Sequence, residues 1–224
     1  MNDVEQGMGY YKRALDVDPL HLPALEAMER IYIERGQNVE LVDILTRKGK
    51  SLTNPEQIAA TKLRTAGMYE TTLAQPDKAA QVYREVLEVD SGNLLAMRGL
   101  EREYGALSQW AELIKVLEMQ LDVVQTERER IDVLLKIAEN QETHFLKPDL
   151  AAARLEQVVE IDPANEGAFE SLERCYRRLR QWHDLINAYD RHINATLDRQ
   201  KKIELYGATA KVYAEEVQDT ERAI

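Results

Sequence analysis

Arginine recurs in this chain at a fixed interval, each time within the tetrad Glu-Arg-x-Tyr. The three arginines are Arg30, Arg102 and Arg174. Arg98 stands four residues before Arg102, and Arg178 stands four residues after Arg174, so a helix would place two positive charges side by side in each pair. Like charges at this spacing lower helix stability, and an anionic partner would offset that cost. These residue types therefore indicate binding of an anionic group.

A structural explanation of the same arginines predicts different contacts. Glu26 and Arg30 are spaced for an ion pair within one helix, as are Glu170 and Arg174. An arginine of one repeat could also meet a glutamate of the next. Ligand binding predicts arginines without glutamate partners, whereas a structural role predicts arginines engaged in ion pairs between repeats. The sequence leaves both hypotheses open.

No arrangement of residues typical of a catalytic or metal site is present. The 4 histidines are dispersed along the chain, and none stands at a metal-ligand spacing from Cys175, the single cysteine. The glycine-rich phosphate loop, the Gly-x-Ser-x-Gly nucleophile motif and His-Glu-x-x-His are all missing from the sequence. We therefore expect a protein that is not an enzyme and that needs no metal or organic cofactor.

The composition is that of an acidic protein rich in helix. Of 224 residues, 44% are hydrophobic and 31% are charged, and 29 basic against 40 acidic residues give a formal net charge of −11. This balance argues against general binding of nucleic acid or of an anionic membrane, because phosphate would be repelled. One cysteine allows no internal disulfide bond and fits a reducing compartment, so we expect a cytoplasmic location.

The distance along the chain from Arg30 to Arg102 equals that from Arg102 to Arg174, and we call it the repeat interval. Several other sequence landmarks recur at the same interval. Asp18, Asp90 and Asp162 follow corresponding helical segments, and Trp110 and Trp182 begin others. We expect a single solenoid over residues 1–224, with repeats at 3–74, 75–146 and 147–218 and the start of a further repeat at 219–224. On this interpretation the chain is a fragment of a longer array.

Each repeat is predicted to form four helices. In the second repeat, Asp77 is placed to cap the first helix, and Thr126 opens the fourth with a capping-box signature. Asn54 and Pro55 open the fourth helix of the first repeat. Short loops join antiparallel neighbours, so each repeat is two helical hairpins. Three repeats predict an all-α solenoid of about twelve helices.

The helices resemble tetratricopeptide repeats. In the second helix of that family, a small residue is followed four positions later by a large apolar residue, then by another apolar residue and Asp-Pro. The matching residues are Ala79, Tyr83 and Val86 in one repeat and Ala151, Leu155, Val158, Asp162 and Pro163 in the next. The resemblance implies a right-handed α-solenoid that binds other proteins, and it does not identify the ligand.

The sequence departs from the family at the contact between the two helices of a hairpin. The family has glycine after the leucine of the first helix and a small residue opposite it, which allows a close crossing. Glutamate and leucine replace them, so we expect these helices to lie further apart or to shift. The residues concerned are Glu29, Glu101 and Glu173, and Leu41, Leu113 and Leu185.

The resemblance places the recurring arginines on a concave face, because the first helix of each tetratricopeptide hairpin lines that face. Lys136 and Asn140 would face the same way and are similar to the first element of the family's carboxylate clamp. Ser171, Leu205 and Thr209 stand where the clamp's other residues belong, so we exclude a full clamp. The expected ligand-binding residues are Arg30, Arg98, Arg102, Lys136, Asn140, Arg174, Arg177 and Arg178.

Three functional hypotheses follow from these observations. The first is a scaffold that binds a peptide or protein segment, of acidic character, in the concave groove. The second is a structural spacer that acts through its ends or its convex face, and the third is a regulatory domain of a larger enzyme. We expect a protein or peptide partner rather than nucleic acid or membrane, and we also consider end-to-end self-association.

Overall fold

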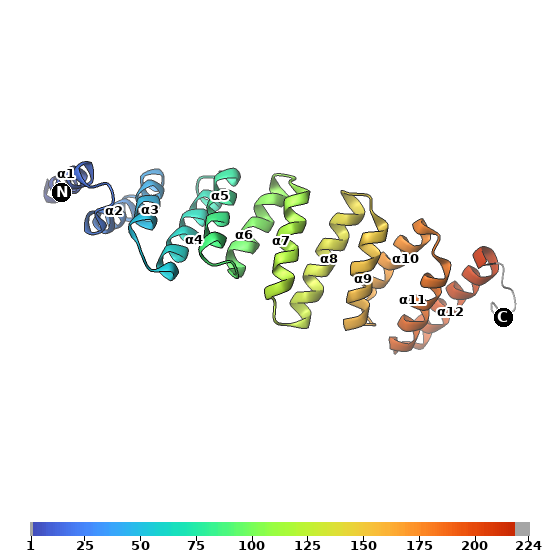
Figure 1. Ribbon diagram of the computed structural model, residues 1–224. Coiled ribbons are helices and arrows are strands. Elements are labelled where there is room, and N and C mark those ends of the chain that lie inside the picture. Colours follow the sequence, from blue (N-terminus) through green and yellow to red (C-terminus); the bar gives the residue numbers. More distant parts are fainter. Residues whose placement is uncertain (1, 218–224) are drawn as a thin grey trace. The chain divides into compact units, whose positions relative to one another are not determined.

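A computed structural model describes residues 2–217 of the chain, so the predicted start of a further repeat at 219–224 lies outside the described residues. Within that range the protein contains helices and no strand, as predicted, and the count of twelve α-helices is confirmed (Figure 1). The helices are α1 (Asn2–Val17), α2 (Leu22–Arg35), α3 (Asn38–Ser51), α4 (Pro55–Thr71), α5 (Pro76–Val89), α6 (Leu94–Ala106), α7 (Trp110–Val123), α8 (Glu127–Thr143), α9 (Pro148–Ile161), α10 (Glu166–Leu179), α11 (Trp182–Ala195) and α12 (Arg199–Lys211), followed by a π-helical turn, Val212–Val217.

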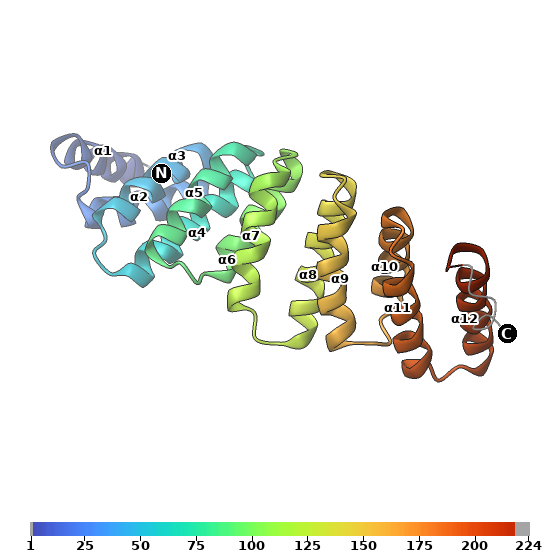
Figure 2. The ribbon, with the colours of Figure 1, turned by 45° about the vertical axis from the view of Figure 1, so that its right-hand side comes forward.

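The chain forms two compact units, Met1–Val123 and Val124–Ile224. The N-terminal unit holds α1 to α7, and the C-terminal unit holds α8 onward. Inside each unit, consecutive helices pack against one another as hairpins, for example α4 with α5 and α8 with α9 (Figure 2). The bounds of α4 and α8 differ by the repeat interval at both ends, and so do those of α5 and α9. Equivalent positions in the two units can therefore be compared directly.

The predicted helix starts at Asn54 and Thr126 are confirmed. The Asn54 side chain accepts a hydrogen bond from the Glu56 backbone N–H at 2.8 Å, with Pro55 as first helical residue. Thr126 Oγ1 accepts from the Glu129 backbone N–H at 3.2 Å. Each bond satisfies a backbone donor that lacks a partner within the first turn.

The prediction that Asp77 caps α5 is wrong. The residue before this helix is Gln75, and the helix begins at Pro76. Proline suits the first helical position because its fixed φ matches the helix and its nitrogen carries no hydrogen. Asp77 therefore lies inside the first turn, where its negative charge favours the helix dipole without capping it.

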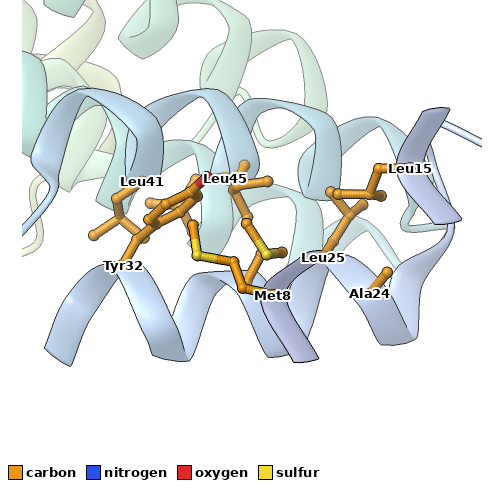
Figure 3. Packing of buried hydrophobic residues seen from close by; sticks show 9 residues of the cluster. Met8, Leu15, Ala24, Leu25, Tyr32, Leu41 and Leu45 are labelled. Carbon is orange, nitrogen blue, oxygen red and sulfur yellow. The ribbon is translucent and has the colours of Figure 1, made fainter. Parts of the chain in front are cut away.

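Apolar side chains from neighbouring helices meet between the layers of each unit. In the N-terminal unit, one buried cluster includes Met8 and Leu15 of α1, Leu25 and Tyr32 of α2, and Leu41 and Leu45 of α3 (Figure 3). Leu25 is 0% exposed. Full burial of one such side chain contributes about 1.5–3 kcal/mol, so this cluster fixes how the first three helices pack.

Among the described residues, no helix combines the length and the apolar character that a bilayer crossing requires.

Candidate functional site

The carboxylate of Glu70 on α4 forms an ion pair with Arg102, one of the recurring arginines. Arg102 of α6 donates from Nε to Glu70 Oε1 at 2.5 Å and from Nη2 to Oε2 at 3.0 Å. This two-pronged contact fixes the plane of the guanidinium group. The Glu70 side chain is 17% exposed and that of Arg102 is 57% exposed, so the carboxylate lies beneath the arginine. The hydrogen bond from Arg102 lowers the pKa of Glu70.

Tyr83 of α5 completes the environment of Glu70. Its hydroxyl donates to Glu70 Oε2 at 2.6 Å, and burial, followed by the hydrogen bond to Glu70, raises the pKa of the Tyr83 phenol. The ring of Tyr83 lies directly on Gly99 of α6, where an added Cβ would be 2.4 Å from the nearest ring atom. Only glycine leaves room for this ring, so Tyr83 fills the space between α4 and α6.

The C-terminal unit repeats the carboxylate and arginine but surrounds them differently. Arg174 of α10 donates from Nη2 to Glu142 Oε2 of α8 at 3.2 Å and to Ser171 Oγ at 3.0 Å. Arg178 Nη1 lies 3.6 Å from Glu142 Oε1. One carboxylate, 13% exposed, thus faces two arginines whose side chains are 57% and 47% exposed. The group carries a net positive charge, whereas Glu70 and Arg102 are balanced.

A cavity of about 330 Å³ lies next to Glu142. Its wall includes Ala138 of α8, Leu155 of α9 and Ser171 of α10, with Arg174 at its edge. Leu155 follows Tyr83 by one repeat interval and occupies its position, and Ser171 likewise occupies that of Gly99. A leucine is too short to fill the space that the tyrosine ring fills in the N-terminal unit. The cavity therefore combines apolar walls with the guanidinium group of Arg174 and the carboxylates of Glu139 and Glu142.

The remaining predicted site residues take several different positions. Arg177 does not join Arg174 and Arg178 at Glu142, because its Nε donates to Glu173 Oε1 at 2.8 Å. Arg30 is exposed and has no ion-pair partner among the described residues. Glu26, which was spaced to pair with Arg30, lies 3.8 Å from Lys48 Nζ instead.

Three further predicted residues lie on α6 and α8. Arg98 is exposed on α6, one turn before Arg102, and Lys136 is exposed on α8. Asn140 donates from Nδ2 to the Lys136 carbonyl at 2.8 Å, and its Oδ1 is buried without a partner in the described part of the chain. Asn140 is thus turned toward its own helix rather than outward for a ligand.

The glutamates that replace the family's glycine receive hydrogen bonds from the following helix. Glu29 accepts from Lys48 Nζ at 2.8 Å and also pairs with Arg64. Burial opposes ionisation of Glu29, but the bonds from both cations outweigh it and lower its pKa. In the equivalent pairs, Gln120 Nε2 donates to Glu101 Oε2 and Tyr189 Oη donates to Glu173 Oε1, each at 2.8 Å.

These hydrogen bonds explain why glutamate can replace the glycine of the family pattern. At this position a side-chain hydrogen bond joins the two helices of a hairpin, where the family packs small side chains against each other. The leucines opposite are buried, with 4%, 6% and 0% exposure for Leu41, Leu113 and Leu185. The signal was present in the sequence, since the glutamates recur at the repeat interval. Their partners are of three different residue types, Lys48, Gln120 and Tyr189, so the partners could not be recognised from the repeat.

No metal site is evident in the described part of the chain, where no group of three or more His, Cys, Asp or Glu side chains could hold an ion. Cys175 is buried, and burial raises the pKa of its thiol to about 11. A thiol with such a pKa is protonated at neutral pH and is a poor nucleophile.

Residues 168–203 match the tetratricopeptide repeat family model. This segment includes α10 without its first two residues, all of α11 and the start of α12, together with Arg174 and Arg178. The match and the hairpin architecture confirm the resemblance predicted from the sequence. No curated protein matches the chain.

Solved structures similar to this chain include several tetratricopeptide proteins. YrrB, described as a TPR protein with an unusual peptide-binding site, is 16% identical over 74% of this chain and 81% of its own, with a TM-score of 0.48. MamA from Desulfovibrio magneticus RS-1 is 14% identical over 74% and 88%, with a TM-score of 0.46. PilF from Pseudomonas aeruginosa is 16% identical over 90% and 88%, with a TM-score of 0.45. At these TM-scores, nothing about the ligand of this chain follows from them.

Proposed function

We propose that this all-α chain is a non-enzymatic scaffold that binds a peptide or protein segment, and that its C-terminal unit holds the contact site. The observation that carries the proposal is the cavity beside Glu142, which has apolar walls and Arg174 in its lining, with Arg178 meeting the same carboxylate. An apolar side chain of the ligand enters the cavity, and an adjacent acidic group meets Arg174 and Arg178. Peptide sites commonly join a buried anchor to a few polar contacts in this way.

The hydrogen-bond donors of the site support an acidic ligand. Arg174 and Arg178 both meet Glu142, and because Glu139 also lines the cavity, the two guanidinium groups are balanced by two carboxylates. In its contact with Glu142, Arg174 uses only its Nη2 atom. Guanidinium groups bind carboxylates through two parallel hydrogen bonds, so Arg174 has donors to offer a second acidic group.

A structural spacer is the second candidate, because the same arginines join separate helices. Arg102 connects α6 to α4, and Arg174 connects α10 to α8. Ion pairs of this kind are the contacts that a structural role predicts, and the expectation that ligand-binding arginines lack glutamate partners is wrong for Arg102, Arg174 and Arg178. On that account, the arginines and Glu142 would be equally important, and no ligand would distinguish them.

The two candidates are separated by comparing variants that break the same contact from opposite sides. Peptides are first selected from a random display library on the full chain and are then titrated by calorimetry. R174Q combined with R178Q should weaken binding about 30-fold or more, the usual effect of losing interface arginines. E142Q breaks the same ion pairs but keeps both arginines, so its affinity should stay within about threefold.

Equal loss of affinity in both variants, in step with a fall in melting temperature, would support the spacer. Binding that resists both variants would place the contact surface outside this cavity and overturn the proposal. Added salt should also weaken binding to the unmodified chain, because ions at 0.15 M screen charges beyond roughly 8 Å.

A further inference from the structure

A second cavity, in the N-terminal unit, has a different character. It encloses about 220 Å³ between α3 and α5, with α4 as its floor. Leu45 and Gly49 of α3 and Val82 of α5 contribute apolar surface, and Tyr69 of α4 presents its aromatic ring. A group of lysines also lines it, one from each helix: Lys50, Lys62 and Lys78.

The lysines are only partly neutralised. Lys62 Nζ lies 2.6 Å from Glu85 Oε2, and Glu85 is the only carboxylate in the described lining. Lys78 Nζ lies 5.6 Å from the centre of the Tyr69 ring, a cation–π contact, and Lys50 and Lys78 have no ion-pair partner among the described residues. Three cations and one anion around a small cavity leave an excess of positive charge. Lys50 and Lys78 are exposed, so their ammonium groups are accessible to an anion from solvent.

The repeat pattern shows that packing does not require these lysines. At the positions one repeat interval later, Lys50 is replaced by Asp122, Lys62 by Leu134 and Lys78 by Leu150. Gly49 is replaced by Leu121. The same helices thus form with apolar or acidic residues at these places, and the cluster of cations belongs to the N-terminal unit alone.

We propose that the cavity formed by Lys50, Lys62 and Lys78 binds a phosphate monoester. Lysine binds phosphate as a mobile point charge, and three lysines can neutralise a group that carries close to two negative charges. The apolar wall and the Tyr69 ring receive the organic part of the ligand. This site is separate from the cavity beside Glu142.

Two sources supply this chemistry, a free phosphorylated small molecule and a phosphoserine side chain on another protein. Phenyl phosphate represents the first and the peptide acetyl-Ala-phosphoserine-Ala-amide represents the second. Each is titrated into the full chain by calorimetry, with the unphosphorylated peptide as a blank. Tighter binding of one probe identifies the source, and either result supports the proposal.

K50Q and K78Q should each lower the affinity for the probe that binds about tenfold or more, the effect of losing a charged hydrogen bond. K115Q is the matched control, because Lys115 is an exposed lysine of α7 in the same unit, and it should leave affinity unchanged. G49L introduces the side chain that the next repeat has at this position. It should block the cavity and abolish binding.

The fold of each variant is checked by circular dichroism, and G49A provides a milder change if G49L unfolds. An added Cβ at Gly49 would lie 3.9 Å from its nearest neighbour, so alanine fits without strain. Absence of binding by both probes would overturn the proposal. So would equal affinity in K50Q, K78Q and K115Q.

Discussion

The surroundings of Glu70 and Glu142 differ although the two carboxylates occupy equivalent positions. Glu70 receives a two-pronged contact from Arg102 and the hydroxyl of Tyr83. Glu142 receives Arg174 and Arg178 and has no tyrosine beside it, since Leu155 stands at that position. Ala106 occupies the position of Arg178 in the N-terminal unit.

The difference shows how one repeat can be closed and another open with few substitutions. A ring packed on glycine fills the first site and satisfies its carboxylate, so that site serves stability. Leucine and serine leave the second site hollow, and Arg178 brings a second guanidinium group to its carboxylate.

The largest effect is expected from Y83L, which opens the filled site. The variant loses part of a buried ring and one hydrogen bond to a carboxylate, so unfolding free energy should fall by about 2–3 kcal/mol. Y83F loses the hydroxyl alone and should cost about 1 kcal/mol. Urea unfolding followed by circular dichroism measures both, and a loss below about 0.5 kcal/mol for Y83L would show that the ring is not needed there.

Exchanging the equivalent small residues Gly99 and Ser171 should change the unfolding free energy by unequal amounts in the two units. G99S places a Cβ against the Tyr83 ring, where 2.4 Å is far below contact distance, so the variant should cost about 1–3 kcal/mol. S171G has no such conflict and should cost about 0.5 kcal/mol through the lower helix propensity of glycine. The same urea titration tests the pair. Similar costs for both would mean that Tyr83 adapts more easily than its packing suggests.

Acid should destabilise the N-terminal unit through Glu70. Arg102 lowers the pKa of the folded Glu70 below the ordinary value of 4.5. The ionised carboxylate therefore stabilises the fold above about pH 4.5, and this contribution is lost as pH falls through the lowered pKa. Melting temperature measured from pH 7 to pH 3 should fall less steeply for E70Q than for the control E112Q, in which an exposed glutamate of α7 is changed. Parallel curves would contradict this assignment.

The smallest effect on stability is expected from R178Q. Arg178 lies 3.6 Å from Glu142 and its side chain is 47% exposed. Exposed ion pairs of this kind contribute at most about 1 kcal/mol and commonly less than about 0.5 kcal/mol. A loss above about 1 kcal/mol in chemical unfolding would instead give Arg178 a structural role.

The repeat interval and the hairpins could be predicted from the sequence because they depend on local signals. Asn54 and Thr126 act on backbone groups two or three residues away, so their roles are readable without the fold. The partners of the arginines were harder to identify. Glu70 and Glu142 also recur at the repeat interval, but each lies 32 residues before its arginine, and only the packing of α4 with α6 or of α8 with α10 brings them together.

The cavity could not be predicted either, although the substitutions that create it are visible. Leucine and tyrosine are both acceptable as the large apolar residue of a tetratricopeptide helix, so the pattern does not distinguish Leu155 from Tyr83. The distinction appears only when the Tyr83 ring is seen against Gly99. Arg177 was predicted to share the face of Arg174 from its spacing, but it also stands four residues after Glu173 and forms an ion pair with that residue.

The most direct test of the account is to give the C-terminal unit the filled arrangement of the N-terminal unit. The double variant L155Y/S171G places a tyrosine on a glycine beside Glu142 and leaves Arg174 and Arg178 in position. Its affinity for the library-selected peptide, measured by calorimetry, should fall about 30-fold or more, while its unfolding free energy stays equal to that of the unmodified chain or rises. Unchanged affinity in a folded double variant would contradict the claim that this cavity receives the ligand.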